Sequence, residues 1–530
     1  MKQELEKIVK SAVSELFSTT VRGVIGIPNQ RYGDFSTNAA ILLSSQIAEP
    51  LPEIAIKIAD YIKSHDDKNW FKSVEATKTG FINFILSDSF LQSRILRIKK
   101  EGSNYGRAKT HNGKTILIEF VSANPTGPLH IGHGRWAVIG DDIASLLEAV
   151  GYKVEREFYV NDCGNQVDML EASVVARAKG VEIPEGGYGG AYIVDLADKM
   201  KADIGKPFFK NILLNTMLED HKRVLGELGV KFDRFFSEKS LHDGGKVAET
   251  IEKMKKSGTT FVEDGALWFK STDYGDDKNR VLVRENGEST YFAADIAYHL
   301  DKFSRGYGQI INVWGADHHG YVARLKTALK ALGLPFEKLE VIIGQMVSLY
   351  RGSEPVRMSK RTGDMITLEE VIQEIGKDAT RFFLTMVTAQ SHLEFDLELA
   401  KKHAIENPVY YVQYAHARIT SIFREWENTG SELVNNPDLT LLAHPAERVL
   451  LRKLLDFEDE IAAAAAKREP HLLVEYAKNL AAIFHNYYHK CRVISDDLNM
   501  TSARLALADA SRIVIKNVLE LLKVEAPERM

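Results

Sequence analysis

Apolar and polar positions follow two different patterns along the chain, and the change from one to the other divides it. Between residues 115 and 370, short apolar runs alternate with longer stretches of helical periodicity; the runs cover residues 115–120, 154–160, 310–314 and 341–343. Short apolar runs separated by amphipathic helices are typical of buried strands in a parallel, doubly wound sheet. Beyond residue 371 the pattern is almost wholly helical, including the run at residues 461–467.

These changes of pattern predict several domains, as a length of 530 residues also requires. We expect an α/β fold with a Rossmann-like, doubly wound parallel-sheet domain, preceded by a small α/β domain and followed by an all-α domain that Asn407-Pro408 introduces. The expected regions are the N-terminal domain at 1–85, a charged linker at 86–114, the parallel-sheet domain at 115–370 with an insertion at about 172–272, a helical region at 371–406, and the C-terminal helical domain at 407–530.

The segment between the first apolar run and the next helix carries the most chemical information. Residues 125–128 form a turn rich in Pro and Gly, and His130-Ile131-Gly132-His133 follows before a helical pattern that continues to about Ala149. A strand, a tight loop and a helix N-terminus together form a geometry that holds a nucleotide phosphate. Gly127 and Gly132 leave room for close approach of backbone and phosphate. Because the loop lacks a Walker lysine, we expect nucleotidyl transfer rather than GTPase or kinase chemistry.

His130 and His133 lie three positions apart and can offer N–H donors on roughly one face of the helix. When an adenylate forms, negative charge builds on the α-phosphate and on the departing pyrophosphate. Fixed donors aimed at such charge are each worth on the order of 3 kcal/mol in a dry site. The alternative is a helix cap with two ordinary histidines, and it would be preferred if this motif stood alone.

A second, basic motif favours the phosphate-site interpretation over a helix cap with two ordinary histidines. Residues 357–363 read Arg-Met-Ser-Lys-Arg-Thr-Gly, and Thr367-Leu368-Glu369-Glu370 then predicts a capped helix N-terminus. A loop with a lysine and a hydroxyl, here Lys360 and Ser359, suits transient stabilisation of a triphosphate. Alone, the motif would be interpreted as a solvated basic loop. Following the histidine motif in this order, it supports a nucleotide site.

The two motifs together resemble the HIGH and KMSKS signatures of class I aminoacyl-tRNA synthetases, and the surrounding blocks resemble arginyl-tRNA synthetases. The resemblance covers essentially the whole chain, through residues 33–38 (GDFSTN), 118–120 and 122–125, 161–166 (NDCGNQ), 291–292 and 295–298, 315–320 (GADHHG), and 526–530 (APERM). One departure is Arg357 at the first lysine of the second signature. The charge is kept, although Arg is a planar fork and Lys a point charge. Since Lys360 is present, we expect an active enzyme.

The resemblance implies roles for individual residues. Its catalytic residues would be His130, His133 and Lys360. Its ATP-binding residues would be His130, Gly132, His133, Gly315, Asp317, Met358, Ser359 and Lys360. Its arginine-binding residues would be Glu119, Ser122, Ala123, Asn124, His133, Tyr291, Asp295 and His318, the last standing where many relatives carry glutamine. The HIGH block as a whole comprises Ala123, Asn124, Pro125, Thr126, Gly127, Pro128, Leu129, His130, Ile131, Gly132 and His133.

An arginine substrate needs carboxylates, because its guanidinium is planar and cannot lose its proton. Glu119 lies near the end of the strand that leads to the HIGH motif, facing the crevice where such folds bind ligands. Asp295 follows Tyr291 by one helical turn, so both can face one pocket. The alternatives are a sheet-edge ion pair for Glu119 and a helix cap or salt bridge for Asp295. The division of contacts between these two acids stays open, while the resemblance places Asn124 and His133 at the amino and carboxylate end of arginine.

Charge and cysteine content limit which binding partners and which cellular compartment we expect. The net charge is −5, so any RNA-binding surface is a local patch rather than a globally basic face. Cys163 and Cys491 form no Cys-x-x-Cys pair, and the His318-His319 pair beside Asp317 has no third ligand at recognisable spacing, so we expect no bound metal site and no disulfide framework. The first helix pattern is not a signal peptide, and no apolar run reaches membrane-spanning length. We expect a cytoplasmic protein.

The resemblance implies ATP-dependent activation of L-arginine to arginyl-adenylate and transfer to tRNA(Arg), with Mg²⁺ accompanying ATP, activation that requires bound tRNA, and a monomeric enzyme. Aromatic residues of the last domain could stack on anticodon bases, although most are expected in the core. Tyr414 and Met530 are the tRNA-binding residues that the resemblance implies. The alternatives are an adenylating enzyme that needs no RNA, a silent synthetase-like RNA-binding protein, and a class I synthetase for another amino acid. The long helical C-terminal domain, the intact HIGH motif with Lys360, and the acids Glu119 and Asp295 argue against these in turn.

Overall fold

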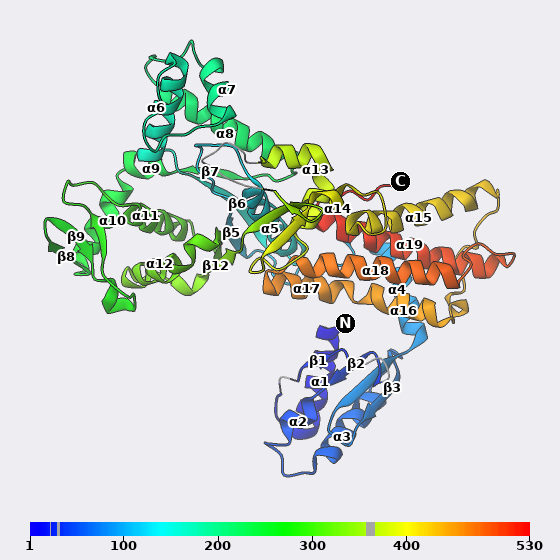
Figure 1. Ribbon diagram of the computed structural model, residues 1–530. Helices are drawn as coiled ribbons and strands as arrows, with labels where there is room; N and C mark the ends of the chain where they lie inside the picture. The colour runs from blue at the N-terminus through cyan, green and yellow to red at the C-terminus, as the bar shows by residue number, and fades with distance from the viewer. Residues whose placement is uncertain (22, 29–31, 357–365) are drawn as a thin grey trace.

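The computed structural model of the chain describes residues 1–21, 23–28, 32–356 and 366–530, and its parts are arranged around a central parallel sheet (Figure 1). The predicted residues Arg357, Met358, Ser359 and Lys360 therefore lie outside the described part of the chain. No described helix is both long enough and apolar enough to cross a membrane.

The N-terminal lobe is a four-stranded antiparallel sheet in the order β1-β2-β4-β3, packed against three helices. Its elements are α1 (Lys2–Phe17), β1 (Ile25–Gly26), β2 (Phe35–Thr37), α2 (Ala39–Leu43), α3 (Leu51–Ser64), β3 (Phe71–Ala76) and β4 (Ile82–Leu86). Ile82, Phe84 and Leu86 alternate with half-buried residues, which puts one face of β4 in the core. Gly33 has a φ of 119°, and a Cβ there would lie 2.7 Å from the Phe84 carbonyl oxygen. Only glycine fits this position without strain.

Residues 86–114, expected as a charged linker, contain a packed helix. Helix α4 (Asp88–Glu101) is capped by Ser87 and is followed by the short 3₁₀ turn η2 (Gly102–Asn104). Phe90, Leu91, Ile95 and Ile98 are buried, and α4 packs against helices α16 and α19 of the C-terminal lobe. The charged residues visible in the sequence therefore occupy the outer face of an ordered connection.

The central sheet is fully parallel, in the order β12-β11-β5-β6-β7. Its strands are β5 (Thr115–Glu119), β6 (Lys153–Val160), β7 (Arg234–Ser237), β11 (Gln309–Gly315) and β12 (Leu339–Gly344). The chain begins in the middle at β5, adds β6 and β7 on one side, and returns to add β11 and β12 on the other. This is the predicted doubly wound topology, and it reverses between β5 and β11, where such folds bind their ligands.

Helix α5 (Ile131–Ala149) joins β5 to β6 and is buried along most of its length. Gly140 on this helix leaves room for Phe120, and Gly344 at the end of β12 leaves room for Trp136 of the helix. A Cβ on Gly140 would lie 2.3 Å from the Phe120 ring, and a Cβ on Gly344 would lie 1.9 Å from the Trp136 ring. These contacts fix the height of the helix over the sheet.

The span expected as one insertion, about 172–272, is divided by a strand of the central sheet. Helices α6 (Asn165–Lys179), α7 (Ala191–Lys199) and α8 (Phe209–Glu227) share a small core of their own before β7. After β7 come α9 (Glu238–Asp243), α10 (Lys246–Lys256), β8 (Thr260–Glu263), β9 (Ala266–Phe269), η3 (Ser271–Tyr274) and β10 (Arg280–Val283). Strand β7 escaped prediction because it has four residues, none fully buried.

Four further α-helices and a small sheet follow in the described part of residues 291–401. The elements are α11 (Tyr291–Ser304), η4 (Ala316–His318), α12 (His319–Ala331), η5 (Phe336–Lys338), β13 (Val347–Arg351), β14 (Glu354–Pro355), α13 (Leu368–Leu384), β15 (Leu393–Asp396) and α14 (Leu397–Lys401). Strand β15 pairs in parallel with β13, so residues 371–406 are not wholly helical as expected. Its four residues are too few to stand out in the sequence pattern.

The C-terminal lobe consists of helices joined by loops, with no strand in residues 408–530, all of which are described. It contains α15 (Pro408–Asn428), η6 (Leu439–Leu441), α16 (Pro445–Leu455), α17 (Phe457–Lys467), α18 (His471–Lys490) and α19 (Leu498–Leu521). Asn407 caps α15 through its side chain and Pro408 occupies the first turn, as the sequence indicated.

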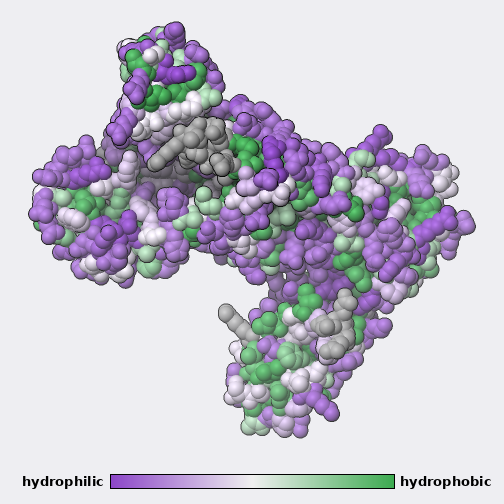
Figure 2. Space-filling view, viewed as in Figure 1, coloured by the Kyte–Doolittle hydropathy of each residue, from purple (hydrophilic) through white to green (hydrophobic). Residues whose placement is uncertain are grey.

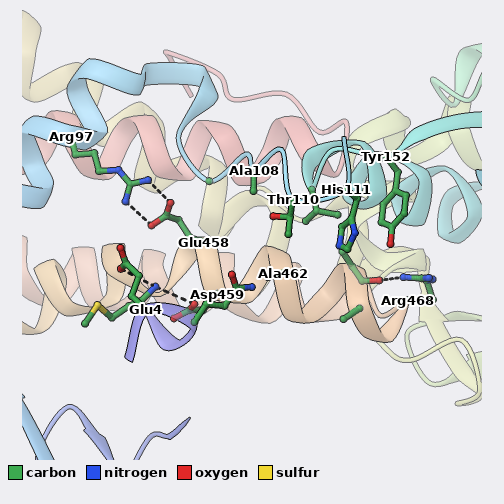
Figure 3. A pocket seen from close by; sticks show the side chains of 16 residues that line it. Glu4, Arg97, Ala108, Thr110, His111, Tyr152, Glu458, Asp459, Ala462 and Arg468 are labelled. Carbon is green, nitrogen blue, oxygen red and sulfur yellow. Dashed lines mark hydrogen bonds and ion pairs between the residues drawn. The ribbon is translucent and has the colours of Figure 1, made fainter. Parts of the chain in front are cut away.

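The N-terminal lobe is tied to the C-terminal lobe by ion pairs. The Arg448 guanidinium donates to Asp34 Oδ2 at 2.8 Å. At the end of α4, Arg97 donates to both carboxylate oxygens of Glu458 on α17, and the amine of Met1 lies 3.2 Å from Asp459 (Figure 3). A crevice of about 510 Å³ lies between these elements.

Apolar side chains also appear on the surface of the N-terminal lobe (Figure 2). Val24, Ile27, Leu42, Ile56 and Phe81 are each more than a third exposed. Exposed apolar residues gathered on one small domain are typical of a contact surface.

Candidate active site

The predicted site residues gather at the carboxyl ends of β5 and β11. Glu119 is the last residue of β5, and the HIGH loop runs directly from it into α5. Gly315 ends β11, and Asp317 and His318 follow in η4. Because neighbouring parallel strands end at one edge of a sheet, both groups face the crevice at the point where the strand order reverses.

The two histidines of the HIGH motif cap helix α5 through their own rings. His130 Nδ1 accepts from the backbone N–H groups of Gly132, at 3.1 Å, and of His133, at 3.4 Å. His133 Nδ1 accepts from the His130 N–H at 3.3 Å, and the two rings stack with centroids 3.7 Å apart. A neutral imidazole that accepts at Nδ1 carries its proton on Nε2. The cap therefore sets both rings in the tautomer that donates from Nε2, at a helix N-terminus.

The HIGH loop is supported from the lobe of α6, α7 and α8. Tyr192 Oη donates to the Thr126 carbonyl at 3.0 Å, and His221 Nε2 lies 2.8 Å from the Gly127 carbonyl. Burial lowers the pKa of His221, which keeps the ring neutral with Nε2 as the donor. Sequence reasoning missed both residues, because no local motif marks them.

The segments that flank the two signature motifs are in contact. Thr367 and Glu370 form a capping box at the start of α13, which confirms the predicted helix start. Thr367 pairs with His130 in an isolated β-bridge, and the Leu368 N–H donates to the Leu129 carbonyl at 2.8 Å. The fold therefore brings the segment that follows the second motif, Thr367 and Leu368, to the HIGH loop.

A buried arginine fixes α5 against the neighbouring loops. Arg135 donates to four backbone carbonyls, those of Gln345, Met346, Thr388 and Ser391, at 2.7 to 3.1 Å. Its side chain is fully buried, and desolvation lowers its pKa to about 10. These bonds connect helix α5 to the loop before β13, which holds Gln345 and Met346, and to the loop after α13, which holds Thr388 and Ser391.

Glu119 already has a cationic partner. Its Oε2 accepts from Lys302 Nζ at 2.5 Å and its Oε1 from Ser122 Oγ at 2.8 Å, and all three side chains are buried or half-buried. Lys302 also donates to Asn312. The sequence left two alternatives for Glu119, a ligand contact in the crevice or an ion pair. The structure shows an ion pair, and this pair lies at the strand end that faces the crevice.

Asp295 stands differently, since no salt bridge to it is formed by described residues. Its Oδ2 accepts from Tyr321 Oη at 2.5 Å. Desolvation, together with the charges of Glu119 and Glu238, raises the pKa of Asp295 to about 7. Tyr291, one turn before it, is half exposed at the mouth of the same pocket. A cation bound beside Asp295 would therefore stabilise the ionised form of its carboxylate.

Glu238 is a third carboxylate at this pocket, and sequence reasoning missed it. It begins α9 directly after β7, and its charge raises the pKa of both Asp295 and Tyr291. Burial raises the pKa of Glu238 itself. The position after a strand end could have signalled it, but β7 was not predicted.

The remaining predicted residues lie around the crevice. Asn124 Nδ2 donates to Gln166 Oε1 at 2.7 Å, which joins two of the sequence blocks. Ala123, the neighbour of Asn124, is buried. Asp317 and His318 are exposed and lie 3.6 Å apart. A Cβ on Gly315 would lie 2.7 Å from Asp317 Oδ1, so glycine suits this strand end.

The two predicted tRNA contacts lie in the C-terminal lobe. Tyr414, on α15, accepts from Arg418 at 2.7 Å and stacks on Tyr410. The tail that leads to Met530 is held on the same helix, because His416 Nδ1 bonds the Pro527 carbonyl at 2.8 Å. Met530 is half exposed. Phe484 and Tyr487 are fully buried, as expected for core aromatics.

Comparison with known proteins agrees with this geometry. A sequence model described as "tRNA synthetases class I (R), catalytic domain" matches residues 94–183 and 190–423. The parallel sheet with the HIGH loop at its switch point, together with this match, defines a class I aminoacyl-tRNA synthetase. An "Arginyl tRNA synthetase N terminal domain" model matches residues 3–86, and a "DALR anticodon binding domain" model matches residues 412–530. The chain belongs to the arginyl-tRNA synthetase family.

Individual relatives are similar over nearly the whole chain. An arginine--tRNA ligase of Desulforudis audaxviator is 47% identical over 528 residues, which cover 96% of this chain and 93% of the relative. That of Heliobacterium modesticaldum is 45% identical over 95% of this chain and 93% of its own. The structure of Thermus thermophilus arginyl-tRNA synthetase superposes with a TM-score of 0.81 at 23% identity, covering all of both chains, which is a likeness of fold.

Proposed function

We infer that the chain is an arginine–tRNA ligase, which joins L-arginine to tRNA(Arg) in two steps. The arginine carboxylate first attacks the α-phosphorus of Mg-ATP, which gives arginyl-adenylate and releases pyrophosphate. A ribose hydroxyl of the 3'-terminal adenosine of tRNA then attacks the arginyl carbonyl, and AMP leaves. The observation that carries this inference is the position of Asp295, an acid with no salt bridge from described residues, beside the strand end that leads into the HIGH cap.

In the activation step we propose that His130 and His133 donate from Nε2 to the phosphate oxygens as negative charge builds on them. No side chain need become a covalent nucleophile, because positioning and charge stabilisation suffice. Lys360, Met358 and Ser359, which lie outside the described residues, would complete the triphosphate site as the family resemblance implies. Gly132, Gly315 and Asp317 would border the nucleotide at the two strand ends.

For the amino acid we propose that Asp295 receives the guanidinium, with Glu238 as a second negative wall and Tyr291 beside them. Glu119 shares its charge with Lys302, so its role would be to hold Ser122 and the start of the HIGH loop and to face the α-amino group. Asn124 and His133 would bind the amino and carboxylate end, with Ala123 and His318 lining the pocket. This is the division of contacts between Glu119 and Asp295 that we propose.

For the tRNA we propose three contacts: the N-terminal lobe with its exposed apolar residues at the outer corner, residues 371–406 at the inner stem, and Tyr414 with Met530 near the anticodon. A single chain would suffice, since the proposed residues all come from one chain. A cytoplasmic location would supply tRNA and ATP and keep Cys163 and Cys491, which form no disulfide, reduced.

The test is ATP–pyrophosphate exchange with arginine, with and without arginine-accepting tRNA, and with lysine and glutamine as controls. We expect exchange only with arginine plus tRNA. Exchange without RNA would indicate an uncoupled adenylating enzyme, and a folded, tRNA-binding protein without any exchange would indicate a silent relative.

A further inference from the structure

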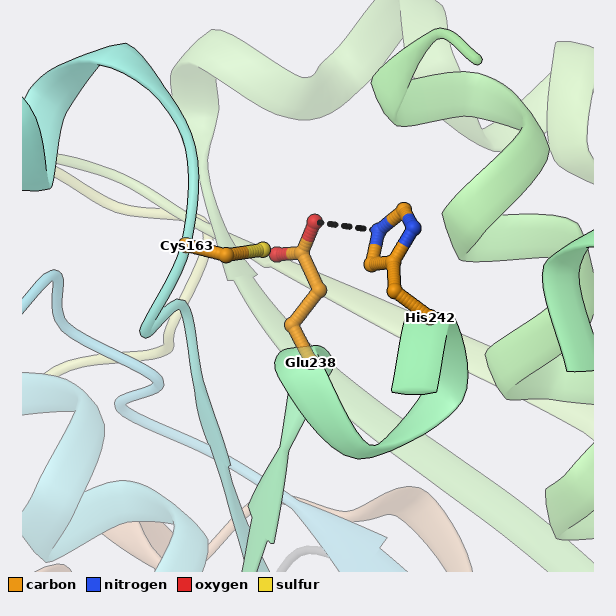
Figure 4. A group of neighbouring side chains, drawn as sticks. All are labelled: Cys163, Glu238 and His242. Atoms are coloured by element: carbon orange, nitrogen blue, oxygen red, sulfur yellow. Dashed lines mark ion pairs between the residues drawn. The ribbon is translucent and has the colours of Figure 1, made fainter. Parts of the chain in front are cut away.

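Three metal-ligating side chains converge at the wall of the proposed arginine pocket (Figure 4). A thiol from Cys163, a carboxylate oxygen of Glu238 and a ring nitrogen of His242 lie within 4.8 Å of one another. Cys163 belongs to the loop after β6, whereas Glu238 and His242 lie one turn apart on α9. We propose that these residues bind one thiophilic divalent cation, of which Zn²⁺ is the reference ion, and that its binding opposes arginine binding.

The donor set selects the class of ion. Thiolate, imidazole and carboxylate are the ligands of Zn²⁺, whereas Mg²⁺ and Ca²⁺ prefer oxygen ligands alone. In a tetrahedral zinc site, neighbouring donor atoms lie about 3.3 to 3.6 Å apart. His242 Nε2 and Glu238 Oε1 are 3.8 Å apart and all three donor atoms lie within 4.8 Å of one another, so the donors would have to move closer together around an ion.

The loop and the helix that supply these ligands are held together by other bonds. Asp162 accepts from Ser237 Oγ at 2.5 Å and from the Lys239 N–H at 2.8 Å. Asn161, with its amide nitrogen facing its acceptors, donates to Glu238 Oε2 at 3.0 Å and to the Cys163 carbonyl at 3.2 Å. These contacts orient the ligands before an ion arrives, as the supporting contacts around metal ligands generally do.

The burial of the three residues suits a site that ions enter from one side. The Glu238 side chain is 4% exposed, Cys163 is half-buried, and the His242 side chain is 35% exposed. The carboxylate would anchor the ion on the inner side, and a water molecule could complete four-coordination on the outer side. No local motif marks this cluster, because its ligands come from two distant segments.

The effect on arginine follows from charge and rests on the proposed function. Glu238 faces both Asp295 and Tyr291, and a Cβ on Gly164, next to Cys163, would lie 3.2 Å from Tyr291 Oη. A divalent ion at this wall would neutralise the negative field that favours the guanidinium and would repel it directly. Ion and arginine should therefore compete.

The ion site itself is tested with Co²⁺ as a spectroscopic probe on the full-length, chelator-treated protein. We expect one Co²⁺ per chain with a near-ultraviolet thiolate-to-cobalt band that Zn²⁺ displaces. The band should disappear in Cys163→Ser, weaken in His242→Ala and persist in Cys491→Ser, the matched control for the other, buried cysteine. Absence of the band in the wild type, or its persistence in Cys163→Ser, would overturn the proposal.

Competition is then measured as equilibrium binding of labelled arginine without ATP or pyrophosphate, both of which chelate Zn²⁺. At Zn²⁺ ten times above its dissociation constant, the apparent arginine Kd should rise about tenfold in the wild type and in Cys491→Ser. In His242→Ala the ratio of Kd with and without Zn²⁺ should approach one. Equal ratios in all variants would overturn the competition. A protein that binds Co²⁺ through Cys163 but binds no arginine in metal-free buffer would contradict the proposed function instead.

Discussion

The cap that His130 and His133 form is compatible with the phosphate-binding role that we propose for them, although the two looked like alternatives in the sequence. Their Nδ1 atoms cap helix α5, and for that reason their Nε2 atoms carry the protons that a phosphate could accept. The cap is thus part of the proposed chemistry, since it fixes the tautomer and the ring orientation before ATP binds. Asp295 is the complementary case: it accepts a hydrogen bond from Tyr321 but forms no salt bridge with a described residue, and desolvation raises its pKa, so a bound cation would stabilise its ionised form.

The two roles of His130 can be separated by substitution. Asn retains an N-cap acceptor but has no Nε2 donor, whereas Ala loses both. We expect His130→Ala to lower the free energy of unfolding by about 1 kcal/mol and His130→Asn to leave it nearly unchanged. ATP–pyrophosphate exchange should fall on the order of 100-fold or more in both variants. Exchange near the wild-type rate in His130→Asn would show that the cap alone matters.

Arginine binding should depend on pH through Asp295. Its pKa of about 7 in the free protein means that the ionised receptor is complete above pH 7 and is lost as the pH falls through 7. Between pH 8 and pH 6 the ionised fraction falls from about 0.9 to about 0.1, so the arginine Kd should rise about tenfold. Equilibrium dialysis of labelled arginine measures this change.

Controls must cover the other groups that face Asp295, namely Glu119, Glu238, Lys302 and Tyr321. Asp295→Asn should weaken binding on the order of 100-fold and flatten the pH dependence. Glu238→Gln should keep a pH dependence while weakening binding less. A wild-type Kd that is the same at pH 6 and pH 8 would exclude Asp295 as the titrating receptor.

At the scale of elements, helix α8 contacts the flanks of both signature motifs. His221 holds the Gly127 carbonyl of the HIGH loop, and two positions later Arg223 forms a two-pronged pair with Glu369 in the first turn of α13, at 2.8 Å for each bond. Tyr192 on α7 adds a second bond to the HIGH loop. The lobe of α6, α7 and α8 therefore supports the position of the loop as well as forming a surface.

Removing one of these supports should displace the loop without touching the arginine pocket. We expect Tyr192→Phe, which deletes only the hydroxyl bonded to Thr126, to lower the kcat of tRNA-dependent exchange about tenfold while the KM for arginine changes less than twofold. His221→Ala should show the same split with a larger loss. Glu219→Gln, an exposed change on α8, is the control. A rise in KM with unchanged kcat would contradict a positioning role.

At the scale of the whole molecule, a buried charge cluster joins the HIGH helix to both ends of the helical region. Arg381 on α13 contacts Asp141 at 3.0 Å and Asp142 at 2.5 Å on α5, and it also donates to the Leu522 carbonyl after α19. Lys523 reaches Asp141 at 2.5 Å. The C-terminal lobe thus contacts the catalytic helix directly, which offers a route by which bound tRNA could act on activation.

Deleting Arg381 would leave the buried carboxylate of Asp142 without its ion-pair partner, while Asp141 would keep Lys523. We expect Arg381→Met to destabilise the protein by about 3 to 5 kcal/mol and to lower the thermal midpoint of the catalytic and C-terminal lobes together. The matched control is Arg351→Met, an exposed arginine paired with Glu374, which should cost about 0 to 1 kcal/mol. Calorimetric scans of both variants measure the difference, and equal midpoints would contradict a connecting role for the cluster.

The sequence predicted those elements whose signal is long and periodic. Strands β5, β6, β11 and β12 and helix α5 lie within about two residues of their predicted bounds, because apolar runs and a helical stripe persist over several turns or pleats. Strands β7 and β15, with four residues each, carry too little pattern to be seen. Missing β7 made the expected insertion a single span and hid Glu238 at its end.

The candidate site was predictable where its residues form local motifs and unpredictable where distant segments meet. The HIGH histidines, Glu119 and Asp295 were named from local context, and the structure brings them to one end of the sheet. The partners that decide their state are remote in sequence: Lys302 for Glu119, Tyr321 for Asp295, and His221 for the HIGH loop. Single-sequence patterns contain no information on such pairings, since each partner alone is an ordinary helical residue.

The contact between Asp34 and Arg448 has a consequence for the length and shape of the tRNA that the protein can bind. Asp34 lies in the N-terminal lobe and Arg448 in the lobe that carries Tyr414, so the ion pair holds the two proposed RNA-contacting lobes at a set separation. With a set separation of this kind, the distance between the anticodon and the outer corner of an RNA would decide whether the RNA can bind both lobes. An RNA that presents the correct anticodon but a shortened or bent path to its outer corner could engage one lobe or the other, but not both at once.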